Sequence, residues 1–261
     1  MAKAKPLIYL EMLKIVTIIS IIFILSCSSE ITNDSDSNDF DYLRSMKNKT
    51  KKSPSEISTY KFHFESSSAA FVIIDMQNFS CSSTNGGLPE IEKVITRINQ
   101  FVAFCRIKKI PIIWVRQNIN IDQDQTDGGL FSLFHSKSHL KQMTNLGEGT
   151  EIYQGMDFDS IQDHLVFKNR YSAFLSTPPE LQNKLKSLHR TQLIIAGVAA
   201  NVCVESTIRD AMQLDYEVTL LSDGTTATSN HLLESTLQNI QLFFGDVRSV
   251  DELIKEIETN D

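Results

Sequence analysis

Short, continuous apolar runs alternate with longer amphipathic stretches from Ala69 to the C-terminus. The short runs are rich in β-branched residues, as in Ala70–Ile74, which is typical of strands buried on both faces. The longer stretches carry apolar side chains at helical spacing, as in Leu88–Lys108. The pattern predicts strands over residues 70–74, 110–115, 165–167, 192–196 and 217–221, a short segment at Val247, and helices over residues 88–108, 178–188, 202–214, 231–243 and 251–257.

The repeated alternation predicts one α/β domain, a three-layer sandwich around a mostly parallel sheet of about six strands. Residues 117–150 interrupt the alternation because they are polar and contain glycine, and we expect a long loop or insertion there. The chain contains no Gly-x-Gly-x-x-Gly and no P-loop sequence, so a nucleotide-binding role has no support.

The N-terminal segment has the order of a secretory signal. Lys14 precedes the apolar run Ile15–Leu25, which is too short to span a membrane comfortably as a mature helix. The sequence Ile24-Leu25-Ser26-Cys27 resembles the lipobox of bacterial lipoproteins, in which the cysteine is lipidated and becomes the first residue. We therefore expect residues 1–27 to be a lipoprotein-type signal, and the mature protein to be exported and anchored to a membrane through Cys27.

Two alternatives stay open for this segment: an uncleaved signal anchor, and a start-site artefact, with a cytoplasmic protein if the true start lies downstream of the signal. Met12 is also a plausible true start, because it would give a more compact signal. Residues 28–57 are rich in Ser, Asn, Asp and Lys and cannot bury a core, so a disordered tether is expected. The folded domain then covers residues 58–261.

Composition adds few constraints. Hydrophobic residues make up 41% of the 261 positions, which is enough for one sizeable core. The net charge is −7 and no basic run is long enough to indicate nucleic acid as a partner. The four cysteines (Cys27, Cys81, Cys105 and Cys203) match no metal or disulfide spacing, and lipidation of Cys27 would leave at least one thiol of the domain unpaired.

Three reactive residues fall at the carboxyl ends of predicted strands, where an open parallel sheet binds its ligands. Asp75 follows the first strand, Lys168 follows the third, and Cys203 begins the helix after the fourth. Each alone has an ordinary explanation: the aspartate as a turn former, the lysine as a solvated side chain and the cysteine as a core filler. Their shared position at one edge of the sheet favours a catalytic role for the three residues together.

The placement of Cys203 is the most informative. A helix N-terminus and a nearby lysine lower the pKa of a thiol, and the thiolate is the nucleophile that attacks an amide carbonyl. Backbone N–H groups of the same turn can receive the oxyanion, and a carboxylate can pass the thiol proton to the departing amine. Cys105 lies on the apolar face of a helix and is expected in the core, and Cys81 lies in the loop after Asp75 without such a setting.

Three segments resemble the motifs of isochorismatase-like cysteine hydrolases. They are Phe71-Val-Ile-Ile-Asp75-Met-Gln77-Asn78, Val166-Phe-Lys168-Asn-Arg170-Tyr171-Ser172-Ala173-Phe174 and Gly197-Val-Ala-Ala-Asn201-Val-Cys203-Val-Glu205-Ser206-Thr207-Ile-Arg209-Asp210-Ala211. Their order and spacing match those of the family from about residue 69 to the C-terminus, which is nearly the whole domain. Ala200 is a departure, because the family usually has threonine there.

The resemblance implies an isochorismatase-like, Rossmann-like fold and a set of roles. Asp75 would be the general base and acid, Lys168 would hold the thiol as thiolate, and Cys203 would form an acyl-enzyme that water hydrolyses. The family's cis peptide bond would fall at Val198–Ala199, and the backbone N–H groups of Ala199 and Cys203 would form the oxyanion hole. No cofactor is implied. A homo-oligomer is expected, because family members are commonly dimers or tetramers.

The sequences of these motifs resemble those of the branch that includes ureidoacrylate amidohydrolases and biuret hydrolases. This resemblance implies a small amide or ureide as substrate. Gln77, Asn78 and Tyr171 are candidate substrate contacts by position. The Asp-x-His pair with which nicotinamidases bind metal is absent, so no metal site is expected. His135 and His139, spaced i, i+4, could hold a metal on a helix, but two isolated histidines are more typical of a surface.

Two other functions stay open. Hydrolysis of the vinyl ether of isochorismate needs no thiol, so the placement of Cys203 argues against it. A surface-tethered binding protein without catalysis fits the lipoprotein-like start and Ala200, although all three catalytic residue types are present.

Mass spectrometry of the protein isolated from bacterial membranes tests the N-terminus. We expect the mature chain to begin at an acylated Cys27, because the signal would be removed as the cysteine is lipidated. An unmodified chain that begins at Met1 would contradict export.

Overall fold

The computed structural model describes most of the expected domain, namely residues 61–82, 87–122 and 125–260. The signal over residues 1–27, the lipidation of Cys27 and the tether over residues 28–57 lie outside the described residues and stay predictions. None of the helices in the described ranges is both long and apolar enough to cross a membrane.

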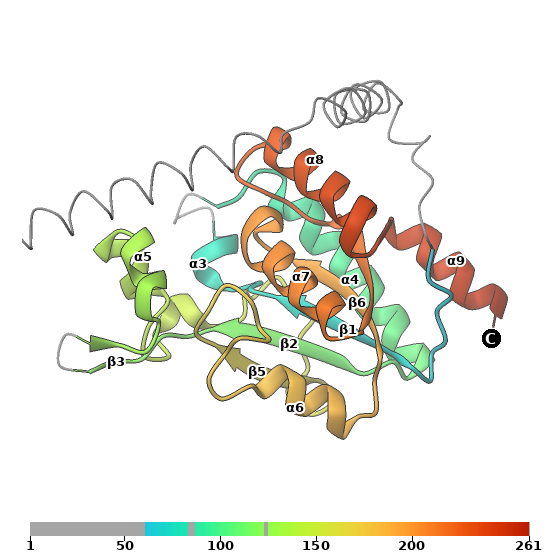
Figure 1. Cartoon of the computed structure of the whole chain (residues 1–261), viewed down its shortest axis with the longest axis horizontal. Helices are drawn as coiled ribbons and strands as arrows, with labels where there is room; N and C mark the ends of the chain where they lie inside the picture. Colours follow the sequence, from blue (N-terminus) through green and yellow to red (C-terminus); the bar gives the residue numbers. More distant parts are fainter. Residues whose placement is uncertain (1–60, 83–86, 123–124, 261) are drawn as a thin grey trace, which may run out of the picture. The chain divides into compact units, whose positions relative to one another are not determined.

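A parallel sheet of six strands forms the centre of the domain (Figure 1). The strand order is β5-β2-β1-β6-β7-β8, and every neighbouring pair in it is parallel. The strands are β1 (Ala69–Ile74), β2 (Ile112–Gln117), β5 (His164–Lys168), β6 (Gln192–Gly197), β7 (Glu217–Thr225) and β8 (Asp246–Arg248). The expected α/β fold and the size of its sheet are confirmed.

Helices cover both faces of the sheet, which gives three layers. The main helices are α4 (Ile91–Lys108), α6 (Glu180–Ser187), α7 (Glu205–Gln213), α8 (Asn230–Asn239) and α9 (Val250–Asn260). Phe71 and Ile73 of β1 pack with α4 and α9 on one face, whereas Val72 and Ile74 pack with α6, α7 and α8 on the other. Successive side chains of a strand point to opposite faces, so a continuous apolar run is needed where both faces are covered.

The insertion after β2 is built of short elements rather than one long loop. They are the antiparallel pair β3 (Ile121–Asp122) and β4 (Gln125–Thr126), then η3 (Gly129–Phe134), α5 (Lys137–Gln142) and η4 (Glu148–Thr150). Each is too short to produce a periodic hydrophobic pattern, which is why the sequence does not predict it. Three smaller elements also differ from expectation: α3 (Asn78–Cys81) follows β1, and the π-helical turns η5 (Ala200–Val204) and η6 (Ile240–Phe244) adjoin α7 and α8.

The strand register brings the carboxyl ends of the central strands together. Ile74 of β1 pairs with Gly197 of β6, and Gln117 of β2 pairs with Lys168 of β5. Gly197 has a φ of 113°, and a Cβ atom there would lie 2.1 Å from the carbonyl oxygen of Ile74. Only glycine fits this position, and β6 can therefore end in a sharp turn directly beside β1.

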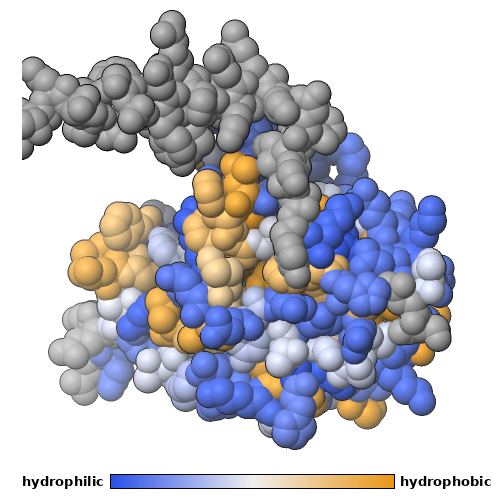
Figure 2. Space-filling view, turned by 45° about the vertical axis from the view of Figure 1, so that its right-hand side comes forward, coloured by the Kyte–Doolittle hydropathy of each residue, from blue (hydrophilic) through white to orange (hydrophobic). Residues whose placement is uncertain are grey.

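The face shown in Figure 2 has hydrophilic areas and separate apolar patches. Exposed apolar side chains include Leu130, Leu133 and Phe134 of η3 and Phe243 of η6. Exposed apolar groups of this kind are frequent at sites of association. The expected homo-oligomer nevertheless stays a prediction.

We expect Gly197→Ala to lower the free energy of unfolding by about 2–4 kcal/mol, because the methyl group would collide with the Ile74 carbonyl and alanine avoids this φ. Gly147→Ala is the matched control. Its φ is −68° and a Cβ there would lie 3.3 Å from the nearest atom, so the expected cost is below about 1 kcal/mol. Urea unfolding measures both, and equal losses would contradict this explanation of Gly197.

Candidate active site

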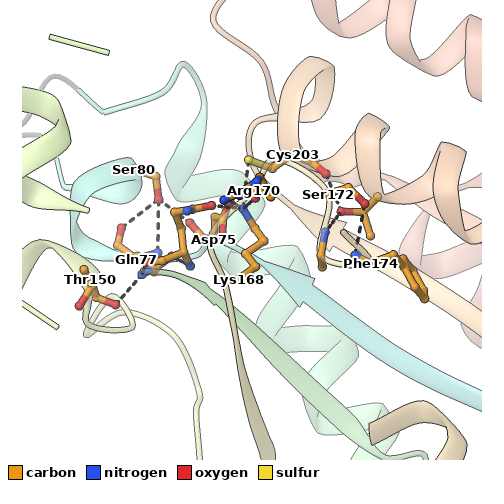
Figure 3. Close-up of polar contacts among 12 residues, drawn as sticks. Asp75, Gln77, Ser80, Thr150, Lys168, Arg170, Ser172, Phe174 and Cys203 are labelled. Carbon is orange, nitrogen blue, oxygen red and sulfur yellow. Dashed lines mark hydrogen bonds and ion pairs between the residues drawn. The ribbon is translucent and has the colours of Figure 1, made fainter. Parts of the chain in front are cut away.

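The structure brings Asp75, Lys168 and Cys203 together at the carboxyl edge of the sheet (Figure 3). Asp75 directly follows β1, Lys168 is the last residue of β5, and Cys203 lies in η5. Asp75 has a φ of 53°, a left-handed conformation that is uncommon outside glycine. The three side chains thus come from separate parts of the chain, and the parallel sheet is what joins them.

The Lys168 ammonium is the centre of the contacts. Its Nζ lies 2.8 Å from Oδ2 of Asp75 and 3.3 Å from Sγ of Cys203. It also donates to Oε1 of Gln117 at 2.5 Å and to the carbonyl oxygen of Arg170 at 3.1 Å. The side chain is 0% exposed, and a buried ammonium is stable only when acceptors surround it. This set of contacts fixes the lysine between the carboxylate and the sulfur.

The surroundings of the Cys203 thiol act against the expected thiolate. Burial raises the pKa of the thiol, the Asp75 carboxylate raises it further, and Lys168 opposes both without cancelling them. The sequence-based expectation counted the helix terminus and the lysine but not the burial of the sulfur beside a carboxylate. The direction of the shift favours a protonated resting thiol with a base next to it, and the expected thiolate stays a prediction.

The pKa values of Asp75 and Lys168 are both raised, with different consequences for their charge. Burial raises the pKa of Asp75, although the Lys168 ammonium opposes this. Burial disfavours the Lys168 ammonium, but the neighbouring Asp75 carboxylate and Cys203 side chain outweigh burial and raise the lysine pKa. The lysine therefore stays charged, while Asp75 takes up a proton more readily than an exposed carboxylate. Its Oδ1 is buried and has no hydrogen-bond partner among the described residues.

The turn after β6 is held by backbone hydrogen bonds. The Val198–Ala199 peptide bond is cis, as the resemblance implied. The Ala199 carbonyl accepts from the N–H of Val202 and of Val204, and the N–H of the buried Ala200 donates to the Thr226 carbonyl at 2.8 Å. None of these bonds needs the hydroxyl that the family usually has at position 200. The Ala199 N–H has no backbone acceptor within the described part of the chain.

A cavity of about 320 Å³ includes Cys203 in its wall. The lining residues are Asp75, Phe79, Ser80, Gly87, Leu88, Gln117, Phe131, His135, His139, Met143, Tyr171, Ala199, Val202, Cys203 and Thr228. Larger hollows of about 520 and 690 Å³ contain none of the three reactive residues. The mixture of an apolar wall with a few convergent polar groups is typical of a small-molecule site.

Gln77 and Asn78 do not line this cavity, contrary to expectation. Gln77 is fully buried, donates from Nε2 to the carbonyls of Gln117 and Thr150, and accepts the Gln117 N–H at Oε1. Its amide is used at both ends to join the segment after β1 to the end of β2, so none of it is left for a substrate. Asn78 donates to the Glu148 carbonyl at 2.9 Å and lines a separate hollow.

Tyr171 lines the cavity. Gln117 and His135 also line it, although the sequence did not predict either as a substrate contact. Oε1 of Gln117 is fixed by the Lys168 ammonium, which leaves Nε2 as a buried donor without a partner. Nε2 of His135 is likewise buried and unpartnered. Gln117 was missed because the predicted strand ended too early, and the rule that finds residues at carboxyl ends would otherwise have selected it.

The other cysteines of the described domain have no part in the cavity. Cys81 and Cys105 are free and buried. Burial raises the pKa of Cys81 to about 12 and the pKa of Cys105 well above its ordinary value. Cys105 packs in the core on α4, which confirms the expectation for it.

His135 and His139 stack with ring centroids 5.2 Å apart. Within the described ranges no group of three or more His, Cys, Asp or Glu side chains is placed to hold a metal. His139 is exposed as expected, but His135 is half-buried in the cavity wall, so the surface interpretation was wrong for it. Burial lowers the pKa of both imidazoles.

Known proteins match the same part of the chain. The isochorismatase domain model matches residues 69–252. Ureidoacrylate amidohydrolase RutB of Enterobacter sp. (strain 638) is 34% identical over 201 residues, which cover 70% of this chain and 86% of that protein. RutB of Methylorubrum extorquens is 32% identical over 206 residues, which cover 72% of this chain and 82% of that protein.

Solved structures share the fold. A cysteine hydrolase from Pseudomonas syringae pv. phaseolicola 1448A has a TM-score of 0.69 at 22% identity and covers 79% of this chain and 100% of its own. Nicotinamidase PncA from Bacillus subtilis has a TM-score of 0.58 at 19% identity and covers 70% and 99%. The family model spans most of the domain. The chain therefore belongs to the isochorismatase family.

Proposed function

We propose that this chain hydrolyses the C–N bond of a small amide or ureide through a Cys203 acyl-enzyme, with Asp75 as the acid and base. Its family and its relatives at 32–34% identity make it a hydrolase acting on amides. The observation that carries the finer proposal is the Lys168 ammonium, which contacts both Asp75 and Cys203 at the wall of the cavity.

The first step is attack by sulfur. The thiol proton moves from Cys203 to the Asp75 carboxylate as Sγ bonds to the carbonyl carbon, and the carbonyl electron pair moves onto oxygen. The raised pKa values support this order, since the thiol keeps its proton at rest and the buried aspartate can hold it afterwards. The N–H groups of Ala199 and Cys203 would receive the negative oxygen.

The second step releases the nitrogen. The carbonyl reforms as the C–N bond breaks, and protonated Asp75 gives its proton to the leaving nitrogen, which departs as ammonia or an amine. The acyl group remains on Sγ as a thioester. Water then attacks the thioester, Asp75 accepts the water proton and returns it to sulfur, and the acid product leaves. Lys168 stays protonated and balances the negative charge at each stage.

We expect Cys203→Ala to lower ammonia release from a ureide or amide by about 10³-fold or more, because no nucleophile remains. Cys81→Ala is the control, since that thiol does not line the cavity, and it should keep activity within about threefold. A loss of less than about tenfold in Cys203→Ala would contradict the acyl-enzyme.

Alkylation by iodoacetamide tests the electrostatics of the thiol separately from turnover. Because burial and Asp75 hold the thiol pKa above its ordinary value, the rate for Cys203 should rise with pH and show no plateau near neutrality. Asp75→Asn removes the carboxylate, so the pKa should fall and alkylation at pH 7 should speed up by about tenfold per unit of pKa. Hydrolysis should be lost in the same variant.

Lys168→Met is the opposite control for this experiment. It removes the ammonium that lowers the thiol pKa, so alkylation should become slower than in the unmodified protein. Peptide mapping assigns the alkylated cysteine. A fast, pH-independent reaction of Cys203 from pH 6 upward would show a resting thiolate and would refute the proton transfer to Asp75.

A further inference from the structure

The cavity beside Cys203 offers a substrate a mainly apolar, aromatic wall. Phe79, Phe131, Met143 and Tyr171 all line it, and the same side chains pack together in a small apolar cluster of their own. This cluster is separate from the two large clusters that hold the sheet and its helices. The part of a substrate that does not react is therefore bound mainly by apolar contact.

The same wall provides no cation to a ligand. Among the described residues that line it, none is lysine or arginine. Lys168 is 0% exposed, and it already contacts the Asp75 carboxylate, whose charge it balances, and the sulfur of Cys203. Residues 83–86 and 123–124, which the structure does not describe, contain no lysine or arginine either. A carboxylate on a substrate would lose its hydration here without gaining a charged partner.

His135 supplies a polar group on the aromatic wall. Its ring centroid lies 4.5 Å from that of Phe131, 5.2 Å from that of His139 and 6.2 Å from that of Tyr171. These neighbours fix the plane of the imidazole, and its Nε2 is buried with no hydrogen-bond partner. Burial lowers the pKa of this imidazole, so the ring is neutral at neutral pH. A neutral imidazole donates or accepts one hydrogen bond but offers no charge.

We infer that the substrate is uncharged on its non-reacting part, and that Nε2 of His135 makes the hydrogen bond that orients this part against the aromatic wall. The inference rests on the proposed function and narrows its substrate class to amides or ureides with an apolar body and a neutral polar end. The relatives are named for ureidoacrylate, which is an acid, and the substrate of this chain differs from it in that respect.

The test compares 3-ureidoacrylate, which is an anion at its non-reacting end, with its methyl ester, which is uncharged there and larger by one methyl group, with ammonia release as the readout. We expect kcat/KM to be at least about tenfold higher for the ester, because the acid must bury a carboxylate without a cation. Equal values, or a preference for the acid, would overturn the inference while leaving the proposed hydrolysis intact.

A pair of variants tests the role of His135. His135→Phe keeps the ring packing and removes Nε2, so KM for the ester should rise by about fivefold to tenfold while kcat changes by less than about twofold. His231→Phe makes the same replacement in an exposed histidine that does not line the cavity, and it should raise KM by less than about twofold. An equal rise of KM in both variants, or no rise in His135→Phe, would remove His135 from the proposal.

Binding to Cys203→Ser separates failure of the inference from failure of the proposed function. If the unmodified protein turns over neither compound, the proposed hydrolysis of ureides is wrong, and calorimetric titration of this variant still compares the two ligands. Tighter binding of the ester supports the neutral substrate. Tighter binding of the acid, or no binding of either compound, overturns it.

Discussion

The buried ammonium of Lys168 is the constraint on which the rest of the site depends. A charge removed from water must be surrounded by acceptors, and here these come from Asp75, Gln117, Arg170 and Cys203. The acceptors belong to different strands and turns, so the lysine aligns the ends of β1, β2 and η5 with one another. The same ammonium balances the buried carboxylate, which lets a base lie close to the thiol at the cavity wall.

The contacts of Lys168 also determine which polar groups the cavity offers to a ligand. Because Lys168 is fully occupied within the site, none of its charge is left for attracting an anionic ligand. The groups that remain available are dipoles, and they include Nε2 of Gln117 and Nε2 of His135, which lie among aromatic rings. Recognition of substrate then depends on shape and on single hydrogen bonds, whereas the charged groups serve the reacting atoms.

The sequence predicted the sheet and its edge well, because a run such as Ala70–Ile74 has no other stable placement than between two layers of helices. It also located Asp75, Lys168 and Cys203, since one rule about carboxyl ends covers all three. It failed where the outcome depends on packing. Gln77 stands beside Asp75 in the motif, but its amide turns to neighbouring carbonyls. The raised thiol pKa follows from burial, which no spacing of residues reveals.

The position of β5 at the border of the sheet has a consequence for how activity is lost. This strand pairs with β2 alone, whereas β1 has a partner on each side. Segments with fewer partners open locally at a lower free energy than the centre of a domain. Detachment of β5 would withdraw the ammonium and leave Asp75 buried without its counterion. Heat inactivation would then precede the melting of the remaining strands, and the enzyme would lose its chemistry while most of its secondary structure persists.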